Sequence, residues 1–164
     1  MTKIKIITTG GTIDKIYFDA KSEFQVGEPA IGQVLKEANV TCGYDITSLL
    51  RKDSLDLTDR DRSRICEAVT SCPQDRVIVT HGTDTMVDTA LVLKKITGKT
   101  IVLTGAMQPA HFRLTDAVFN IGHAFAAVQL LPPGVYIAMN GRIFDPVTSR
   151  KNRELNRFEN KFFW

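Results

Sequence analysis

Short runs of β-branched and other apolar residues recur along this sequence, and a segment with helical spacing separates each run from the next. Such runs are typical of buried strands, whereas apolar residues three or four positions apart are typical of a helix with one buried face. Parallel strands need crossover connections, which are usually helices, so the alternation predicts an α/β fold with an open, mostly parallel sheet and helices on both faces. The predicted strands are 4–8, 45–50, 77–80, 100–104 and 135–139, and the predicted helices are 30–38, 58–71, 85–95 and 116–129.

Two local motifs sharpen this outline. Thr58 and Asp61 have the spacing of a capping box, which would begin the second predicted helix. Asn140-Gly141 is a strong signal for a type I′ turn, so 142–144 should return as a hairpin strand near the C-terminus.

The composition is that of an ordinary globular protein, with 164 residues of which 43% are hydrophobic and 24% charged. We therefore expect 1–164 to form a single domain. The net charge of +3 is spread along the chain, and its concentration near the C-terminus is too weak to predict binding of nucleic acid. No segment is long and apolar enough to span a bilayer, so no membrane association is expected.

The cysteines bear on the cellular compartment. Cys42, Cys66 and Cys72 are odd in number and form no C-x-x-C pair. This favours reduced thiols over a disulfide framework or a zinc site. No secretory signal precedes the first strand, so a cytoplasmic location is predicted.

Polar residues follow four of the predicted strands. In an open parallel sheet, ligands bind at the carboxyl ends of the strands, where loops and helix N-termini converge. We therefore expect these clusters to contribute to one site. They are Gly10-Gly11-Thr12, Asp53-Ser54, His81-Gly82-Thr83-Asp84 and Gly105-Ala106-Met107.

The first cluster opens a polar stretch that is predicted to be a loop as far as Pro29. Two glycines before Thr12 allow a sharp turn and a close approach to a ligand, and the next amides could donate to an oxyanion, so Thr12 is placed as a nucleophile would be. A tight turn without a ligand is the alternative interpretation. A phosphate loop is disfavoured, because no Gly-Lys-Ser/Thr follows the glycines.

The third cluster carries more polar groups than a turn requires. Capping of the next helix would account for Asp84 but not for His81 and Thr83 as well. A threonine hydroxyl needs a base to take its proton, and Thr83-Asp84 with a lysine, for which Lys151 is a candidate, would supply one. The histidines at 81, 111 and 123 lack metal-ligand spacing, so catalysis without a metal or cofactor is predicted.

Two longer motifs carry a resemblance to a known family. The segments Thr8-Thr9-Gly10-Gly11-Thr12-Ile13 and Val79-Thr80-His81-Gly82-Thr83-Asp84-Thr85-Met86 resemble the two signature segments of the bacterial-type L-asparaginases. Further matches at 53–54, 103–107 and 135–140 extend the resemblance through nearly the whole chain, but only to the N-terminal domain of the family. It implies hydrolysis of L-asparagine, and often of L-glutamine, to the acid and ammonia without a metal.

The resemblance also implies catalytic roles. Thr12 is the implied primary nucleophile, and Thr83 is the second catalytic threonine, in a polar triad with Asp84 and Lys151. Counting from the predicted hairpin places the lysine at 151, with Arg150 as the alternative for a one-residue slip.

Substrate-binding roles follow in the same way. Ser54 is implied to hold the substrate carboxylate and Asp84 the substrate amino group. Gly11 and Ala106 are implied to line the pocket, with Ala106 beside the substrate amide.

Three departures from the family pattern affect these expectations. The lid over the first threonine usually carries a tyrosine, but Phe24 stands at the matching place, which leaves Tyr17 or water to transfer the Thr12 proton. Leu55 replaces a glutamine that is common in high-affinity members. The family's smaller C-terminal domain, which completes the pocket from a neighbouring subunit, has no counterpart in 1–164. With fewer contacts to the substrate, weak affinity is predicted.

The end of the sequence predicts self-association. Leu155, Phe158 and Phe162 have helical spacing, and Phe163-Trp164 follows. Such an apolar stripe must be buried on its own domain or on another subunit. We expect a homo-oligomer, either a dimer or a tetramer. A fragment cut from a longer protein is the alternative.

Three functions are compatible with these observations. The leading hypothesis is a short L-asparaginase that acts through a threonyl acyl-enzyme. The second is the amide-hydrolysing subunit of an amidotransferase, which feeds ammonia to a partner. The third is a non-catalytic amino-acid-binding or regulatory module.

Overall fold

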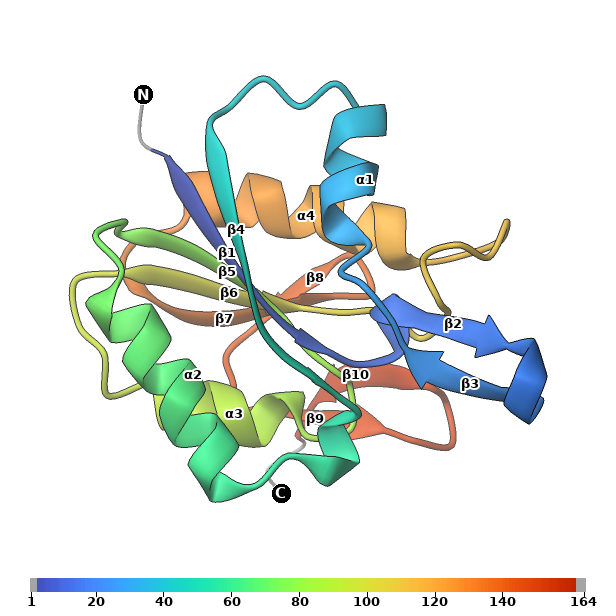
Figure 1. The fold of residues 1–164 in the computed structure, drawn as a ribbon. Helices are drawn as coiled ribbons and strands as arrows, with labels where there is room; N and C mark the ends of the chain where they lie inside the picture. Colours follow the sequence, from blue (N-terminus) through green and yellow to red (C-terminus); the bar gives the residue numbers. More distant parts are fainter. Residues whose placement is uncertain (1–2, 162–164) are drawn as a thin grey trace.

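A computed structural model describes residues 3–161, and it confirms the predicted open α/β sheet (Figure 1). The six strands are β1 (Ile4–Gly10), β4 (Tyr44–Lys52), β5 (Arg76–Thr80), β6 (Thr100–Thr104), β7 (Gly134–Met139) and β8 (Arg142–Phe144). Their order across the sheet is β4-β1-β5-β6-β7-β8. The first five strands in this order run parallel, and β8 pairs antiparallel with β7 at one edge.

Helices cover both faces of the sheet. Helices α1 (Ile31–Glu37) and α4 (Ala117–Leu130) lie on one face, and α2 (Asp59–Ser71) and α3 (Met86–Leu93) lie on the other (Figure 1). Successive strand residues point to opposite faces. Accordingly, Val77 and Val79 join the core beneath α2 and α3, whereas Ile78 joins the core beneath α1 and α4. The continuous apolar strands are therefore buried on both sides, as a parallel sheet requires.

Both local motifs have the predicted structure. The Thr58 hydroxyl accepts a hydrogen bond from the Asp61 amide at 3.2 Å, and the Asp61 carboxylate accepts one from the Thr58 amide at 3.0 Å, which together form a capping box. A hydrogen bond from Lys52 and those from Thr58 lower the pKa of the Asp61 carboxyl to about 2. At the β7–β8 connection, Asn140 has a φ of 52° and Gly141 a φ of 70°, as a type I′ turn requires.

The prediction of a polar loop as far as Pro29 is wrong. This segment contains an antiparallel hairpin of β2 (Lys15–Phe18) and β3 (Glu23–Val26), which projects beyond the sheet (Figure 1). We call 15–26 the lid hairpin. Its residues Ile16 to Phe18 are β-branched or aromatic and favour a strand, and Ser22, with a φ of 52°, closes the turn. The prediction gave too much weight to the polar residues between the two strands.

The expected helical stripe at the end of the chain is also wrong. Residues 149–160 form a second hairpin of β9 (Ser149–Asn152) and β10 (Arg157–Asn160), which we call the C-terminal hairpin. Phe158 is buried against Phe144 of the same chain, with ring centroids 6.2 Å apart, whereas Leu155 is exposed in the turn. Cross-strand pairing of Arg150 with Glu159 favours strands over a helix. Phe162, Phe163 and Trp164 lie outside the described residues.

The helices found between residues 3 and 161 are all too short, or too polar, to cross a bilayer.

Candidate functional site

Glycines allow the loops at the carboxyl edge of the sheet to pack directly against one another. A Cβ atom on Gly11 would lie only 2.5 Å from the Gly82 Cα. One on Gly82 would lie 2.7 Å from the Ser54 Oγ, and one on Gly105 would lie 2.3 Å from the His81 carbonyl oxygen. Any larger residue at these positions would push the loops apart. The four polar clusters are therefore neighbours, and the carboxyl edge holds one continuous candidate site.

The glycine turn after β1 positions Thr12. Gly10 and Gly11 have φ values of 99° and 90°, which L residues with a Cβ rarely adopt. The Gly11 amide already donates to the Lys52 carbonyl at 2.9 Å, so this amide is not available to an oxyanion. Thr12 then begins a short 3₁₀ turn and is half-buried.

Thr12 lines an open pocket of about 220 Å³, which we call the Thr12 pocket. The pocket lies between the lid hairpin and the loop that follows β6. Its lining residues are Thr12, Lys15, Phe24, Gln108, Pro109 and Phe112.

A second cluster lies where β5 ends. The Lys151 Nζ donates to the Thr83 Oγ1 at 2.8 Å and to the Asp84 Oδ1 at 3.0 Å. Thr83 is only 4% exposed and the Asp84 side chain 28%, so the bond from Lys151 to Thr83 is the better shielded of the two. A lysine ammonium has three donors and no acceptor. Lys151 must therefore lose a proton before it can act as a base, and Asp84 is its ion-pair partner.

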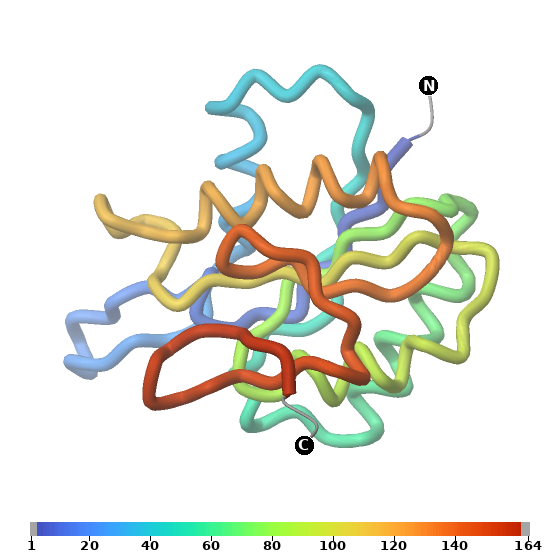
Figure 2. The backbone as a smooth tube through the Cα atoms, turned by 180° about the vertical axis from the view of Figure 1, so that it is seen from behind, coloured from blue at the N-terminus to red at the C-terminus, as the bar shows by residue number. Residues whose placement is uncertain are grey.

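The C-terminal hairpin carries Lys151 to this cluster. Figure 2 shows the red C-terminal segment crossing next to the green segment that follows β5. Because neighbouring strand residues point to opposite faces, Arg150 points away and pairs with Glu159 at 2.7 Å. The structure thus places Lys151, and not Arg150, beside Thr83 and Asp84. Arg153 also reaches the cluster, with its Nε 3.5 Å from the Asp84 Oδ1.

Ser54 presents an unused hydroxyl. Its side chain is 1% exposed, and within residues 3–161 its Oγ has no hydrogen-bond partner. The loop is fixed around it, because the Asp53 carboxylate accepts from the Leu55 amide and the Thr85 hydroxyl donates to the Ser54 carbonyl at 2.8 Å. A buried hydroxyl without a partner is costly unless water or a ligand satisfies it. Ser54 is therefore suited to hold a polar group of a ligand.

The three histidines contact neighbouring protein groups. Burial lowers the pKa of His81 to about 4, so its ring is neutral at neutral pH. Its Nδ1 donates to the Gly82 carbonyl at 2.7 Å, and its Nε2 accepts from the Thr89 hydroxyl at 2.8 Å. His111 contacts the Lys15 carbonyl, and His123 stacks on Phe119 of α4.

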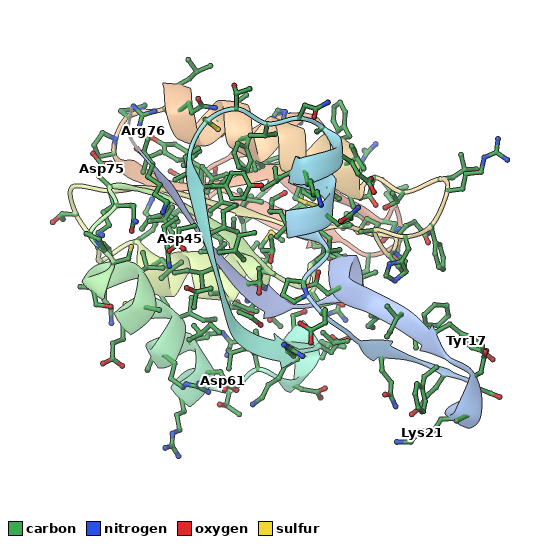
Figure 3. All side chains as sticks on the ribbon, turned by 45° about the horizontal axis from the view of Figure 1, so that its top comes forward. Tyr17, Lys21, Asp45, Asp61, Asp75 and Arg76 are labelled. Carbon is green, nitrogen blue, oxygen red and sulfur yellow. The ribbon has the colours of Figure 1, made fainter. Side chains whose placement is uncertain are left out.

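The two lid residues lie in different places. Tyr17 and Phe24 are opposite each other in the lid hairpin, with ring centroids 5.4 Å apart. Phe24 lines the Thr12 pocket and also contacts Phe112. Tyr17 is 52% exposed and does not line this pocket. Figure 3 shows its side chain toward the outer end of the hairpin. The structure therefore brings Phe24, but not Tyr17, to the pocket of Thr12.

Ala106 and Leu55, which the sequence predicted near the substrate, differ in exposure. Ala106 is 1% exposed and belongs to the core beneath α4, directly after β6. Leu55 is 63% exposed next to Ser54.

Three charged residues escaped the sequence interpretation. Asp14 is 2% exposed, and burial raises the pKa of its carboxyl to about 6. Its Oδ1 accepts from the Ala30 amide, and its carbonyl accepts from the Gly27 amide, each at 2.8 Å, so it ties the base of the lid hairpin to α1. Lys15 pairs with Asp53 at 2.6 Å. Charges directly after an apolar strand and glycine turn were a usable signal for Asp14 and Lys15, but nothing local indicated Arg153.

The fold and this site define a class of protein: an α/β domain whose candidate site lies at the carboxyl edge of a parallel sheet, where two threonine-bearing loops pack together. The chain belongs to the asparaginase family, because the family's "Asparaginase, N-terminal" domain matches residues 3–160.

Individual proteins agree with this assignment. The chain is 31% identical over 159 residues to a glutaminase-asparaginase of Acinetobacter glutaminasificans, covering 86% of this chain and 47% of that protein. It is 26% identical over 160 residues to a glutamyl-tRNA(Gln) amidotransferase component of Methanococcus vannielii, covering 90% and 36%. The thermostable L-asparaginase from Thermococcus kodakarensis aligns with a TM-score of 0.84 at 25% identity, over 96% of this chain and 51% of that chain. The chain thus spans about half the length of these proteins or less.

Proposed function

We propose that this protein is an amidohydrolase that converts L-asparagine to L-aspartate and ammonia, with Thr12 as its nucleophile. One observation carries the proposal: Lys151 lies within hydrogen-bond distance of both Thr83 and Asp84, and the glycine turn of Thr12 packs directly on the loop that holds them. A lysine with a threonine and a carboxylate can activate a hydroxyl group. L-Glutamine is the expected side substrate.

The proposed reaction has two steps. The Thr12 hydroxyl attacks the side-chain carbonyl carbon, the carbon–nitrogen bond breaks, and the hydroxyl proton leaves with ammonia. A water molecule then attacks the resulting ester, the bond between the acyl carbon and the Thr12 oxygen breaks, and the water proton passes through the Thr83 and Lys151 pair to the Thr12 oxygen as aspartate is released. No metal or cofactor takes part in this proposal.

The substrate head group is assigned to the remaining polar residues. Ser54, with its unused buried hydroxyl, is proposed to hold the substrate carboxylate. Asp84, at the exposed side of the cluster, is proposed to bind the amino group. Gly11 and Ala106 would shape the wall beside the amide.

We propose that affinity for asparagine is weak. Leu55 offers no polar group beside Ser54, and Arg153 already lies 3.5 Å from the carboxylate that would bind the substrate amino group. Both features reduce the interactions available to a small polar substrate.

Ammonia release from asparagine and glutamine tests the proposal. We expect release by the unchanged protein and its loss in Thr12→Ala and Lys151→Met. Thr97→Ala and Lys95→Met change the same residue types at exposed positions away from the site and should retain activity. Binding of asparagine without any turnover would contradict the enzyme and support a non-catalytic binding module.

A second candidate is the amide-hydrolysing subunit of an amidotransferase, which the similarity to the amidotransferase component of Methanococcus vannielii favours. Such a subunit should release little ammonia alone and much more with its partner. Ammonia release by the isolated chain that no partner increases would contradict this alternative.

We also propose a single domain over 1–164, a cytoplasmic location and a homo-oligomer. Free thiols at Cys42, Cys66 and Cys72 support the location. The exposed apolar side chains of Val118, Phe119 and Leu130 on α4 support self-association, in place of the C-terminal stripe. Sedimentation as a monomer at micromolar concentration would contradict the oligomer.

A further inference from the structure

The Thr12 pocket is larger than the proposed reaction requires on its leaving-group side. Its volume is about 220 Å³. A water molecule occupies roughly 30 Å³ in the liquid, and ammonia is of similar size. The pocket therefore has room for a substituent on the departing nitrogen.

One wall of this pocket is aromatic. Phe24 comes from the lid hairpin and Phe112 from the loop after β6, and their ring centroids are 5.9 Å apart at an interplanar angle of 62°. The two side chains are 48% and 40% exposed, so each has apolar surface left to cover. Edge-to-face pairs of this kind can be extended by a further ring. Pro109 adds a third apolar side chain to the lining.

The lining also carries a positive charge, which comes from the same face of the lid hairpin as Phe24. Lys15 lines the pocket, and its Nζ is 2.6 Å from the Asp53 carboxylate, which fixes the side chain in place. Among the described residues that line the pocket, Lys15 is the only charged one. Because Lys15 is already paired with Asp53, the lining residues offer no unpaired carboxylate to a cation, and their apolar side chains suit a neutral group.

The pocket adjoins Thr12 but not the residues that are proposed to hold the head group. Of the residues proposed for catalysis and head-group binding, Thr12 alone lines it, whereas Ser54, Asp84 and Lys151 do not. When an aspartyl head group occupies the Ser54 and Asp84 side, the substituent on the amide nitrogen is directed to the remaining open space at Thr12.

We propose that the Thr12 pocket is a leaving-group subsite, and that the protein hydrolyses secondary amides of the aspartate side chain whose amine carries an uncharged aromatic or aliphatic group. This inference rests on the proposed function. The Thr12 oxygen bonds to the carbonyl carbon, the carbon–nitrogen bond breaks, and the amine leaves with the Thr12 proton. Water then hydrolyses the ester, so each turnover consumes one water and yields one aspartate and one free amine.

Three substrates test this specificity: L-asparagine, L-aspartic acid β-anilide and L-aspartic acid β-(2-aminoethyl)amide. Release of aspartate is measured for each with the full chain. We expect kcat/KM for the anilide to exceed that for asparagine by roughly tenfold or more, because the phenyl group is buried between the aromatic side chains. The aminoethyl amide, whose leaving group is cationic, should be the poorest of the three.

Phe112→Ala tests whether the Thr12 pocket causes the preference for the anilide. We expect it to lower the ratio of kcat/KM for the anilide to that for asparagine by roughly tenfold. Leu114→Ala, in the same loop but 87% exposed and outside the pocket, should leave the ratio unchanged. Equal ratios in the two variants would overturn the inference.

The outcomes separate this inference from the proposed function. Turnover of asparagine with none of the anilide overturns the subsite and leaves the asparaginase proposal standing. No turnover of any of the three amides overturns the proposed function and the subsite with it.

Discussion

The two threonine-bearing loops of the site have different surroundings. Thr83 is buried, and its hydroxyl is fixed at 2.8 Å from Lys151, which in turn is held by Asp84. Thr12 is half-buried and faces an open pocket, and no hydrogen bond found within residues 3–161 uses its hydroxyl. The hydroxyl of one threonine is fixed by a lysine, whereas the surroundings of the other depend on what the lid hairpin places over it.

This difference reflects how each loop is supported. Lys151 lies on β9, which contacts α3, and Thr83 lies in the short connection between β5 and α3. Phe24, by contrast, reaches Thr12 from a hairpin that projects from the sheet and is anchored at its base by Asp14. Changes in the Thr83 cluster should therefore affect the chemistry strongly, and changes in the lid hairpin should affect it in smaller steps.

The largest expected effect comes from the Thr83 cluster. Lys151→Met and Thr83→Val should each lower kcat for asparagine by roughly 10²–10⁴-fold, because each removes the proton-transfer pair. The double variant should be little worse than either single one, since the two residues act as a unit. Steady-state ammonia release measures all three. Arg150→Met is the matched control, because Arg150 is on the opposite face of the same strand. If the fold loss of kcat in the double variant equalled the product of the two single losses, the two side chains would act separately.

The anchor of the lid hairpin should affect stability with a defined pH dependence. Burial raises the pKa of Asp14 from 3.8 to about 6, so the folded state binds its proton more tightly than the unfolded state does. Its contribution to stability is therefore fully present below pH 3.8 and is lost as the pH rises through about 6. At pH 7.5, Asp14→Asn should raise the free energy of unfolding by roughly 1–3 kcal/mol, because asparagine keeps the acceptor for the Ala30 amide without the buried charge.

Urea denaturation of both proteins at pH 7.5 and pH 4 measures this effect. The difference in the free energy of unfolding should shrink toward zero at pH 4. Asp19→Asn, at the exposed turn of the same hairpin, is the control. A stabilisation by Asp14→Asn that is equal at both pH values would contradict the assignment to a buried charge.

A substitution of Phe24 in the lid hairpin is expected to increase kcat. Phe24→Tyr adds a hydroxyl to a ring that already lines the pocket of Thr12. If Thr12 lacks a group to accept its proton, kcat for asparagine should rise roughly tenfold, which is less than the roughly 10²–10⁴-fold that an optimally positioned proton carrier provides. Phe18→Tyr adds the same group to an exposed ring of the hairpin outside this pocket and should change nothing. An unchanged kcat in Phe24→Tyr would show that the missing hydroxyl does not limit the reaction.

The smallest expected effect concerns the edge of the Thr83 cluster. Arg153 lies 3.5 Å from Asp84, but its side chain is 67% exposed, so the pair is weak. Arg153→Ala should free Asp84 for the substrate amino group and lower KM for asparagine by about two- to fivefold, with little change in kcat. Arg157→Ala, on the neighbouring strand of the same hairpin, is the control. A rise in KM would mean that Arg153 assists binding.

The sequence by itself determined the main sheet and the position of the site. The apolar runs, the helical spacing between residues 30 and 129, the capping box at Thr58 and the Asn140-Gly141 turn are local patterns, and each had the structure that it predicted. The polar clusters after the strands also converge as predicted, because parallel strands end at one edge. These features depend on residues that are close in the sequence or on the topology of the sheet.

Only the tertiary structure decided the two hairpins and the contacts that they make. The lid hairpin and the C-terminal hairpin are short and mostly exposed, so their composition resembles that of loops, and the apolar spacing of Leu155 and Phe158 did not distinguish a helix from a strand. Burial of Asp14, and the approach of Lys151 and Arg153 to Asp84, join segments far apart in the chain. Such contacts change the charge and geometry of the site, but they leave no periodic pattern in the sequence, because their partners come from other elements.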